Sequence, residues 1–334
     1  MRTPLPIRFI SYLLATLRFP SLPLGFGVFA VLFLMYFVGA VVIAGPELNV
    51  WTTERGRLGF AIVVSVLPPY LFMYLVAATR LNQNVYTILL SQLKSTDASP
   101  LELERYQLGR FWPLTILFGV FLSLLSIDWS ALTFDIDSAG FMESISILTG
   151  AVFIWTSVVL VLFFLLLEGC EYHKLGKQVP IDLYNLDKLN GFGRISLGGF
   201  LWIMGSLALS ALQAIDQEFS WQRYGMILAI GPPAAAVSVI LPSWSVHRRI
   251  RRKKSTHLEE ITAQINLTPT LLSGDALMRM NGLLARKSAI QAVRTWPMDL
   301  SIFSRFVLYV FIPPLAWIGA ALMENFLDFY IAGL

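Results

Sequence analysis

Residues 144–167 read SISILTGAVFIWTSVVLVLFFLLL, a run of 24 amino acids without a charge. A helix needs roughly 20 apolar residues to cross the hydrocarbon core of a bilayer. The run is bounded by Glu143 and Glu168, so charged side chains stand at both of its ends. We therefore expect a membrane-spanning helix here, within an all-α polytopic membrane protein.

Six further uncharged runs have nearly the same length, at 19–46, 58–79, 111–127, 195–215, 224–246 and 306–323. The chain of 334 residues is 56% hydrophobic and 14% charged. Soluble domains carry about 25% charged residues, so a soluble globular protein is excluded. One cysteine and three histidines also exclude an internal disulfide and a multi-histidine metal centre.

The basic residues give the orientation of the seven expected spans. Cytoplasmic segments of membrane proteins collect Lys and Arg. With the N-terminus in the cytoplasm and the C-terminus outside, 22 of the 25 basic residues fall on the inner side. The sequence therefore predicts a multi-pass protein of a prokaryotic inner membrane.

The chain divides into four predicted parts. Residues 1–23 mix arginines with apolar residues and suit an amphipathic helix on the inner leaflet. Residues 24–246 form a six-helix transmembrane region with helical cytoplasmic loops. Residues 247–305 form a basic cytoplasmic helical segment, and residues 306–334 form the seventh transmembrane helix with an outer tail.

The cytoplasmic segments themselves show helical periodicity. After the second span, apolar residues up to Leu93 predict that the helix continues into the cytosol. Thr256 and Glu259 fit a capping box, which predicts that a new helix starts there. A second helix is expected from about Asp275. We expect a compact helical layer under the membrane.

Three diprolines lie inside apolar runs and are candidate pore or cavity residues: Pro68, Pro69, Pro232, Pro233, Pro313 and Pro314. Adjacent prolines remove two backbone donors and clash with the preceding helical turn. Freed carbonyls in a membrane are satisfied by neighbouring helices or line a watery cavity, as in transporters and channels. The alternative is a packed kink without a functional role.

Two charged clusters are further candidates. An outer acidic rim of Asp128, Asp216 and Glu324 would concentrate cations at a pore mouth, or it reflects only the depletion of basic residues from outer loops. A basic run just inside the sixth span predicts contact with anionic lipids of the inner leaflet, and not with nucleic acid. It consists of Arg248, Arg249, Arg251, Arg252, Lys253 and Lys254.

Glu168, Cys170 and His173 lie within six residues at the end of the fourth span. They resemble half of a metal site, but no second cluster completes a four-ligand set. The sequence also lacks a phosphate-binding loop and a hydrolase nucleophile motif. We therefore predict no metal, no cofactor and no enzymatic activity. No span carries a charge at its centre, which disfavours an ion-coupled transporter.

The C-terminal third carries LPSWSVHRR at 241–249, TWPMD at 295–299 and FIPPLAWIGAA at 311–321. It resembles uncharacterised prokaryotic integral membrane proteins. The topology is similar to that of the seven-transmembrane ion channels that include the insect chemoreceptors. That resemblance implies tetramers held by cytoplasmic anchor helices, here 246–305, with a pore lined by the last span, here 306–323.

Three functions are compatible with the sequence. The first is a homo-oligomeric channel for ions or small solutes. The second is a non-conducting scaffold or sensor that docks a cytoplasmic partner. The third is a secondary transporter, which predicts a cavity bordered by Pro68, Pro232 and Pro313 within one protomer.

Overall fold

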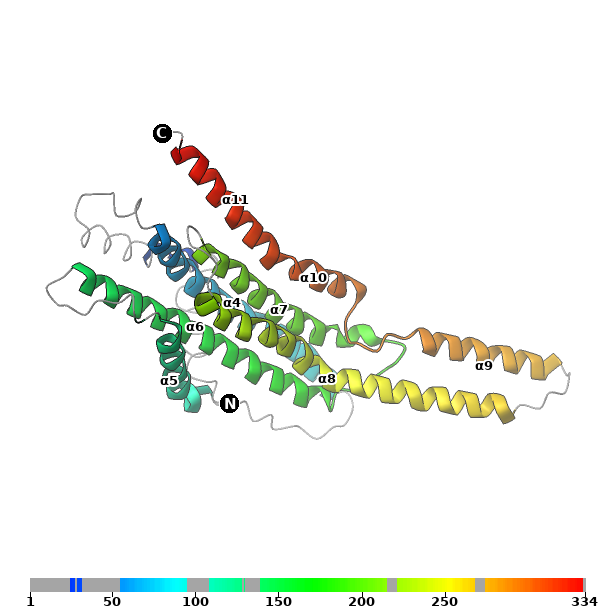
Figure 1. The fold of residues 1–334 in the computed structure, drawn as a ribbon. Coiled ribbons are helices and arrows are strands. Elements are labelled where there is room, and N and C mark those ends of the chain that lie inside the picture. The colour runs from blue at the N-terminus through cyan, green and yellow to red at the C-terminus, as the bar shows by residue number, and fades with distance from the viewer. Residues whose placement is uncertain are drawn as a thin grey trace.

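The computed structural model describes residues 25–27, 29–31, 55–94, 108–127, 129, 139–214, 221–267 and 274–332. All regular elements in these ranges are helices, which confirms the all-α class for the described part of the chain (Figure 1). The helix predicted for residues 1–23 lies outside the described residues.

Four long helices form a bundle: α4 (Arg55–Lys94), α6 (Ala139–Gly176), α7 (Asn190–Ser210) and α8 (Trp221–Leu267). Helices α6 and α7 both pack against α8, and α4 packs against α6 and α7. Helix α5 (Leu108–Ser126) lies against α6 at the side of the bundle (Figure 1). Two short 3-10 helices, Leu186–Leu189 and Ala211–Ala214, flank α7. Because α4 reaches Lys94, the predicted continuation of the second span is confirmed.

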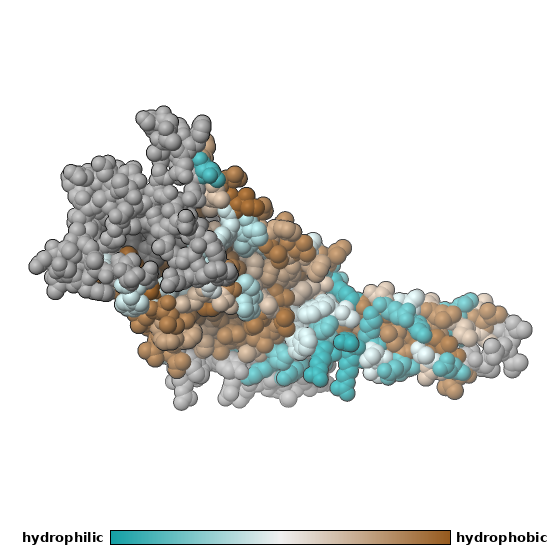
Figure 2. Space-filling model, viewed as in Figure 1, coloured by the Kyte–Doolittle hydropathy of each residue, from teal (hydrophilic) through white to brown (hydrophobic). Residues whose placement is uncertain are grey.

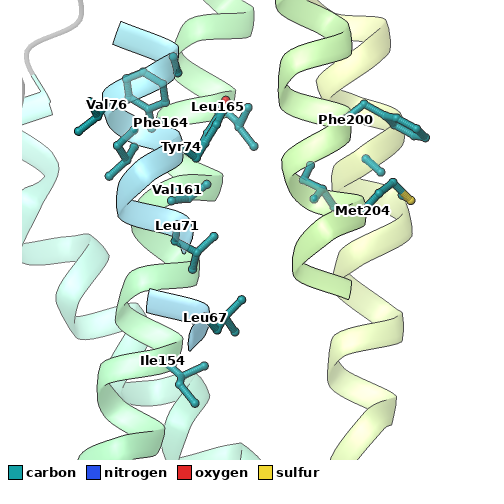
Figure 3. Close-up of a cluster of buried hydrophobic side chains, with 14 of the residues drawn as sticks. Leu67, Leu71, Tyr74, Val76, Ile154, Val161, Phe164, Leu165, Phe200 and Met204 are labelled. Atoms are coloured by element: carbon teal, nitrogen blue, oxygen red, sulfur yellow. The ribbon is translucent and has the colours of Figure 1, made fainter. Parts of the chain in front are cut away.

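The bundle has a buried apolar core where α4, α6 and α7 meet. Figure 3 shows Leu67 and Leu71 of α4 beside side chains of α6, with Phe200 and Met204 of α7 on the other side of the core. A second cluster buries the loop after α6 under the ends of the helices, with Ile181, Leu183, Leu186 and Leu189 as its loop members. The burial of these residues fixes the loop against the bundle.

Four stretches are long and apolar enough to cross a membrane: Ile147–Gly176, Leu186–Ser210, Tyr224–Leu267 and Leu300–Leu322. Two shorter apolar stretches, Ile62–Ala78 and Pro113–Ser126, fall in the second and third predicted spans. The first predicted span lies largely outside the described residues. The helices agree with a membrane protein, while seven spans and their orientation stay predictions.

The diprolines have different effects on their helices. Helices α4 and α8 continue through Pro68–Pro69 and Pro232–Pro233. In a membrane, neighbouring helices and local adjustments satisfy the carbonyls that such prolines release. The third pair follows an interruption of the helix. Phe311 separates α10 (Leu300–Val310) from α11 (Ile312–Ala332). The backbone N–H of Phe311 bonds there to the carbonyls of Leu308 and Tyr309.

The predicted helix start at Thr256 is wrong. Helix α8 runs without interruption from the sixth span to Leu267. The Thr256 hydroxyl donates to the Arg252 carbonyl at 3.1 Å, the bond that a threonine inside a helix makes with the preceding turn. The first helix predicted after the sixth span is therefore the continuation of α8, and not a separate element.

The second predicted cytoplasmic helix is confirmed as α9 (Gly274–Ala292). It runs back along the extension of α8, and together they project from the bundle as an arm (Figure 1). Hydrophilic residues gather where the arm leaves the bundle, while the bundle surface is mostly hydrophobic (Figure 2). Farther from the bundle the arm also exposes apolar residues, among them Leu277, Met278 and Leu284.

Gly282 in the middle of α9 gives a first prediction. A Cβ atom added there would meet nothing within 4 Å. Glycine inside a helix costs about 0.5–1 kcal/mol relative to alanine. We expect Gly282→Ala to slow amide hydrogen exchange along α9 several-fold, measured by mass spectrometry on the purified protein. Unchanged or faster exchange would contradict the interior helical position of Gly282.

Candidate functional site

A carboxylate is buried between two helices of the bundle. Glu168 of α6 is 7% exposed and lies within the candidate span Ile147–Gly176. It directly follows the uncharged run 144–167, which is why the sequence places it at a membrane boundary. Ionisable side chains inside membrane segments are costly, and they commonly mark functional sites. Glu168 is therefore the centre of the candidate site.

Two polar residues of α4 bind this carboxylate. The Asn82 amide nitrogen Nδ2 donates a hydrogen bond to Glu168 Oε1. The Tyr74 hydroxyl forms a hydrogen bond with the same carboxyl group. Tyr74 and Asn82 are eight residues apart, which puts them on one face of a helix. The face of α4 that meets α6 thus carries both partners.

The site is enclosed by packed rings and by helix α8. Tyr74 is 2% exposed, and its ring lies 5.2 Å from the Trp202 ring and 6.2 Å from the Phe164 ring. A Cβ added at Gly169 would lie 2.8 Å from a methyl carbon of Leu241 on α8. The absence of a side chain at Gly169 therefore lets α8 approach closely beside Glu168.

A second polar contact joins α7 and α8. The Ser196 and Ser243 hydroxyl oxygens are 2.9 Å apart, and Ser196 also donates to the Val239 carbonyl. Both serines are fully buried. Most other serines with a hydrogen bond in the bundle, such as Ser206 and Ser238, bond to carbonyls of their own helix. The Ser196–Ser243 contact thus links α7 to α8, whereas most other serine hydroxyls are satisfied within their own helix.

Glu168, Cys170 and His173 were considered as metal ligands. Cys170 and His173 are partly buried at the end of α6. Among the described residues, no group of three His, Cys, Asp or Glu side chains is arranged to hold a metal ion. The groups that contact the Glu168 carboxyl group are the hydrogen-bonding side chains of Asn82 and Tyr74.

The basic run after the sixth span divides into two groups. Arg249 bonds to the carbonyls of Gly176 and Val179, and Lys253 bonds to that of Ile181. Lys254 donates to the carbonyls of Gln291 and Val293 at the end of α9. The remaining three, Arg248, Arg251 and Arg252, are exposed, and lipid contact stays a prediction.

The base of the arm is fixed by Arg294. Its guanidinium lies 2.8 Å from the Asp187 carboxylate and 3.1 Å from that of Asp299, and it also donates to Asn190. Asp299 caps the first turn of α10 by accepting from the Leu300 N–H. One side chain thus links the loop after α6, the end of α9 and the start of α10.

The candidate pore prolines lie in different environments. Pro68 and Pro69 are buried in the bundle, whereas Pro232, Pro233 and Pro314 are exposed and Pro313 is half-buried. The acidic rim lies outside what the structure describes, because Asp128 and Asp216 and the side chain of Glu324 are not among the described parts. The roles proposed for these residues stay predictions.

Tyr74 and Asn82 were not candidates from the sequence. The sequence pattern that could have pointed to them is the eight-residue spacing of two polar groups. Both lie on the face of α4 that also carries buried Ala78. That spacing alone does not identify Glu168, which is 86 residues from Asn82. Comparison with family models, with curated proteins and with solved structures gives no match for this chain.

Proposed function

We propose that this protein is a seven-span membrane protein, with the N-terminus in the cytoplasm, whose copies assemble into a channel for ions or small solutes. The pore in this proposal lies between the copies and is lined by α10 and α11. The basic bias of the inner segments, 22 of 25 Lys and Arg, supports the orientation. We place the protein in a prokaryotic inner membrane.

The poor packing of the last helix carries the proposal. Only 6% of the most apolar stretch of Leu300–Leu322 is buried, against 44% and 50% for the two spans that contain α6 and α7. Phe306 meets Phe200, and Trp317 meets Tyr224, each with ring centroids 5.0 Å apart. These contacts hold one side of α10–α11 to the bundle and leave the opposite side uncovered.

The interior of one protomer supports the same position for the pore. The centre of the bundle is filled by the apolar core, and the buried Ser196 and Ser243 bond to each other. A path between protomers instead uses the uncovered side of α11, where Gly319 has no neighbour within 4 Å of an added Cβ. The break at Phe311 immediately precedes α11, and the exposed Pro314 lies in its first turn.

Cysteine substitution tests this proposal, because Cys170 is the only cysteine of the chain. In a Cys170→Ser background, Leu315→Cys and Ile318→Cys place thiols on the exposed side of α11. Leu117→Cys places a matched thiol on the exposed side of α5. We expect currents in planar bilayers that a charged methanethiosulfonate reduces severalfold for the α11 variants but not for the α5 variant.

Two results would count against a pore at α11. One is the absence of current from correctly inserted protein across voltages, which would favour a scaffold or a transporter. The other is equal sensitivity of the α5 and α11 variants to the reagent. Block confined to α11 would support both the conductance and the position of the pore.

A further inference from the structure

The Glu168 carboxyl group lacks a permanent positive partner among the described residues. From α4 it is faced by Tyr74 and Asn82, which are both neutral hydrogen-bond partners. From its own helix the charged neighbour is Glu171, which has the same sign. From α8 the close contact at Gly169 is the apolar Leu241. A buried carboxylate in such a setting has to be neutralised by something that binds to it.

Arg80 also belongs to α4. Arg80 precedes Asn82 by two residues, so its Cα lies about 200° around the helix axis from that of Asn82. Asn82 is on the face of α4 that meets Glu168. The backbone of α4 therefore places Arg80 on another side of the helix.

The polar groups around Glu168 suit the binding of a proton better than the binding of a metal cation. Asn82 directs its NH₂ group at Oε1, and a hydrogen-bond donor in that place repels a cation. The Asn82 carbonyl oxygen Oδ1 is buried and has no hydrogen-bond partner in the structure. A carboxylic acid needs an acceptor for its O–H group, and an amide offers a donor and an acceptor on one side chain.

We propose that Glu168 is a reversible proton-binding site within the bundle and that Asn82 is its positioning residue. In the ionised form Glu168 accepts hydrogen bonds from Asn82 Nδ2 and from Tyr74. Proton binding forms one O–H bond on the carboxyl group and removes one negative charge. After rotation of the Asn82 amide, that O–H group donates to Oδ1, so the same pair joins α4 to α6 in both states.

This site is independent of whether the protein conducts. It makes the α4–α6 contact dependent on proton concentration, because the number and direction of its hydrogen bonds differ between the two forms. Among the described residues of α4, α6 and α8, Glu168 is the carboxyl group in a buried position, so this site binds a single proton. Glu171, half-buried one turn further along α6, is the matched control residue.

Infrared difference spectroscopy of the full-length protein in vesicles tests the proposal directly. The carbonyl stretch of a protonated carboxyl group is distinct from the amide bands. The experiment follows the intensity and frequency of this band as a function of pH. Because the other Asp and Glu residues also titrate, the component of Glu168 is the difference between the wild-type and Glu168→Gln spectra. We expect this component to persist in Glu171→Gln and to shift in frequency in Asn82→Ala. Glu168→Asp keeps a carboxyl group and is expected to shift the band without removing it.

The same spectra contain the results that would overturn the proposal. Identical wild-type and Glu168→Gln spectra at every pH at which the protein stays folded would show that Glu168 binds no proton. A band that persists unchanged in both Glu168→Gln and Glu168→Asp would assign it to another residue. An Asn82→Ala spectrum identical to that of the wild type would remove Asn82 as the positioning residue. None of these readings uses conductance, so failure here is distinct from failure of the channel proposal.

Discussion

Gly119→Ala is expected to separate α5 from α6 and to destabilise the protein by about 1–3 kcal/mol, the usual cost of overpacking. A Cβ at position 119 would lie 2.6 Å from the Thr156 Cα and 3.0 Å from its backbone nitrogen. Backbone atoms cannot rotate away as a side chain does, so one helix has to move. Small residues at helix interfaces of membrane proteins permit this kind of close approach.

The measurement is thermal unfolding in detergent followed by tryptophan fluorescence. Trp155 of α6 donates its indole N–H to Ser126 of α5 at 2.8 Å, so its emission reports on this interface. Gly282→Ala is the matched control, because the same substitution meets no neighbour in α9. Equal melting temperatures for Gly119→Ala and the wild type would contradict the close packing of α5 on α6.

Local patterns in the sequence predicted the helices well where one physical rule dominates. The uncharged run 144–167 lies within α6, and the helix expected from about Asp275 is α9. In both cases length and periodicity suffice, since they depend on residues within one element. The capping pattern at Thr256 failed because the same letters also suit the exposed surface of a long continuous helix.

Contacts between helices could not be predicted from the length and periodicity of single elements. Asn82 and Glu168 are 86 residues apart, and the pairing of α4 with α6 is a property of the whole bundle. The diprolines show the same limit, because the rule that proline breaks a helix holds at Phe311 but not at Pro68 or Pro232. Neighbouring helices decide whether a carbonyl without its helical partner is tolerated.

Arg249→Met is the second substitution for which we expect a large effect. The Arg249 guanidinium donates to the Gly176 carbonyl at 3.0 Å and to the Val179 carbonyl at 2.7 Å. Gly176 is the last residue of α6, where carbonyls have no partner within the helix. Hydrogen bonds to a charged group contribute about 1.5–3 kcal/mol. Methionine keeps the apolar length of the side chain but leaves both carbonyls without this donor.

Arg248→Met is the control, because it removes the same charge from an exposed neighbour. We expect Arg249→Met to lower the melting temperature in detergent and to increase hydrogen exchange at 174–181, whereas Arg248→Met leaves both unchanged. If lipid contact were the only role of the basic run, Arg248→Met and Arg249→Met would have the same effect. That effect would be seen in vesicles with anionic lipid and not in detergent. A difference in detergent instead means that Arg249 fixes the end of α6 to α8, and that lipid contact falls to the exposed members of the run.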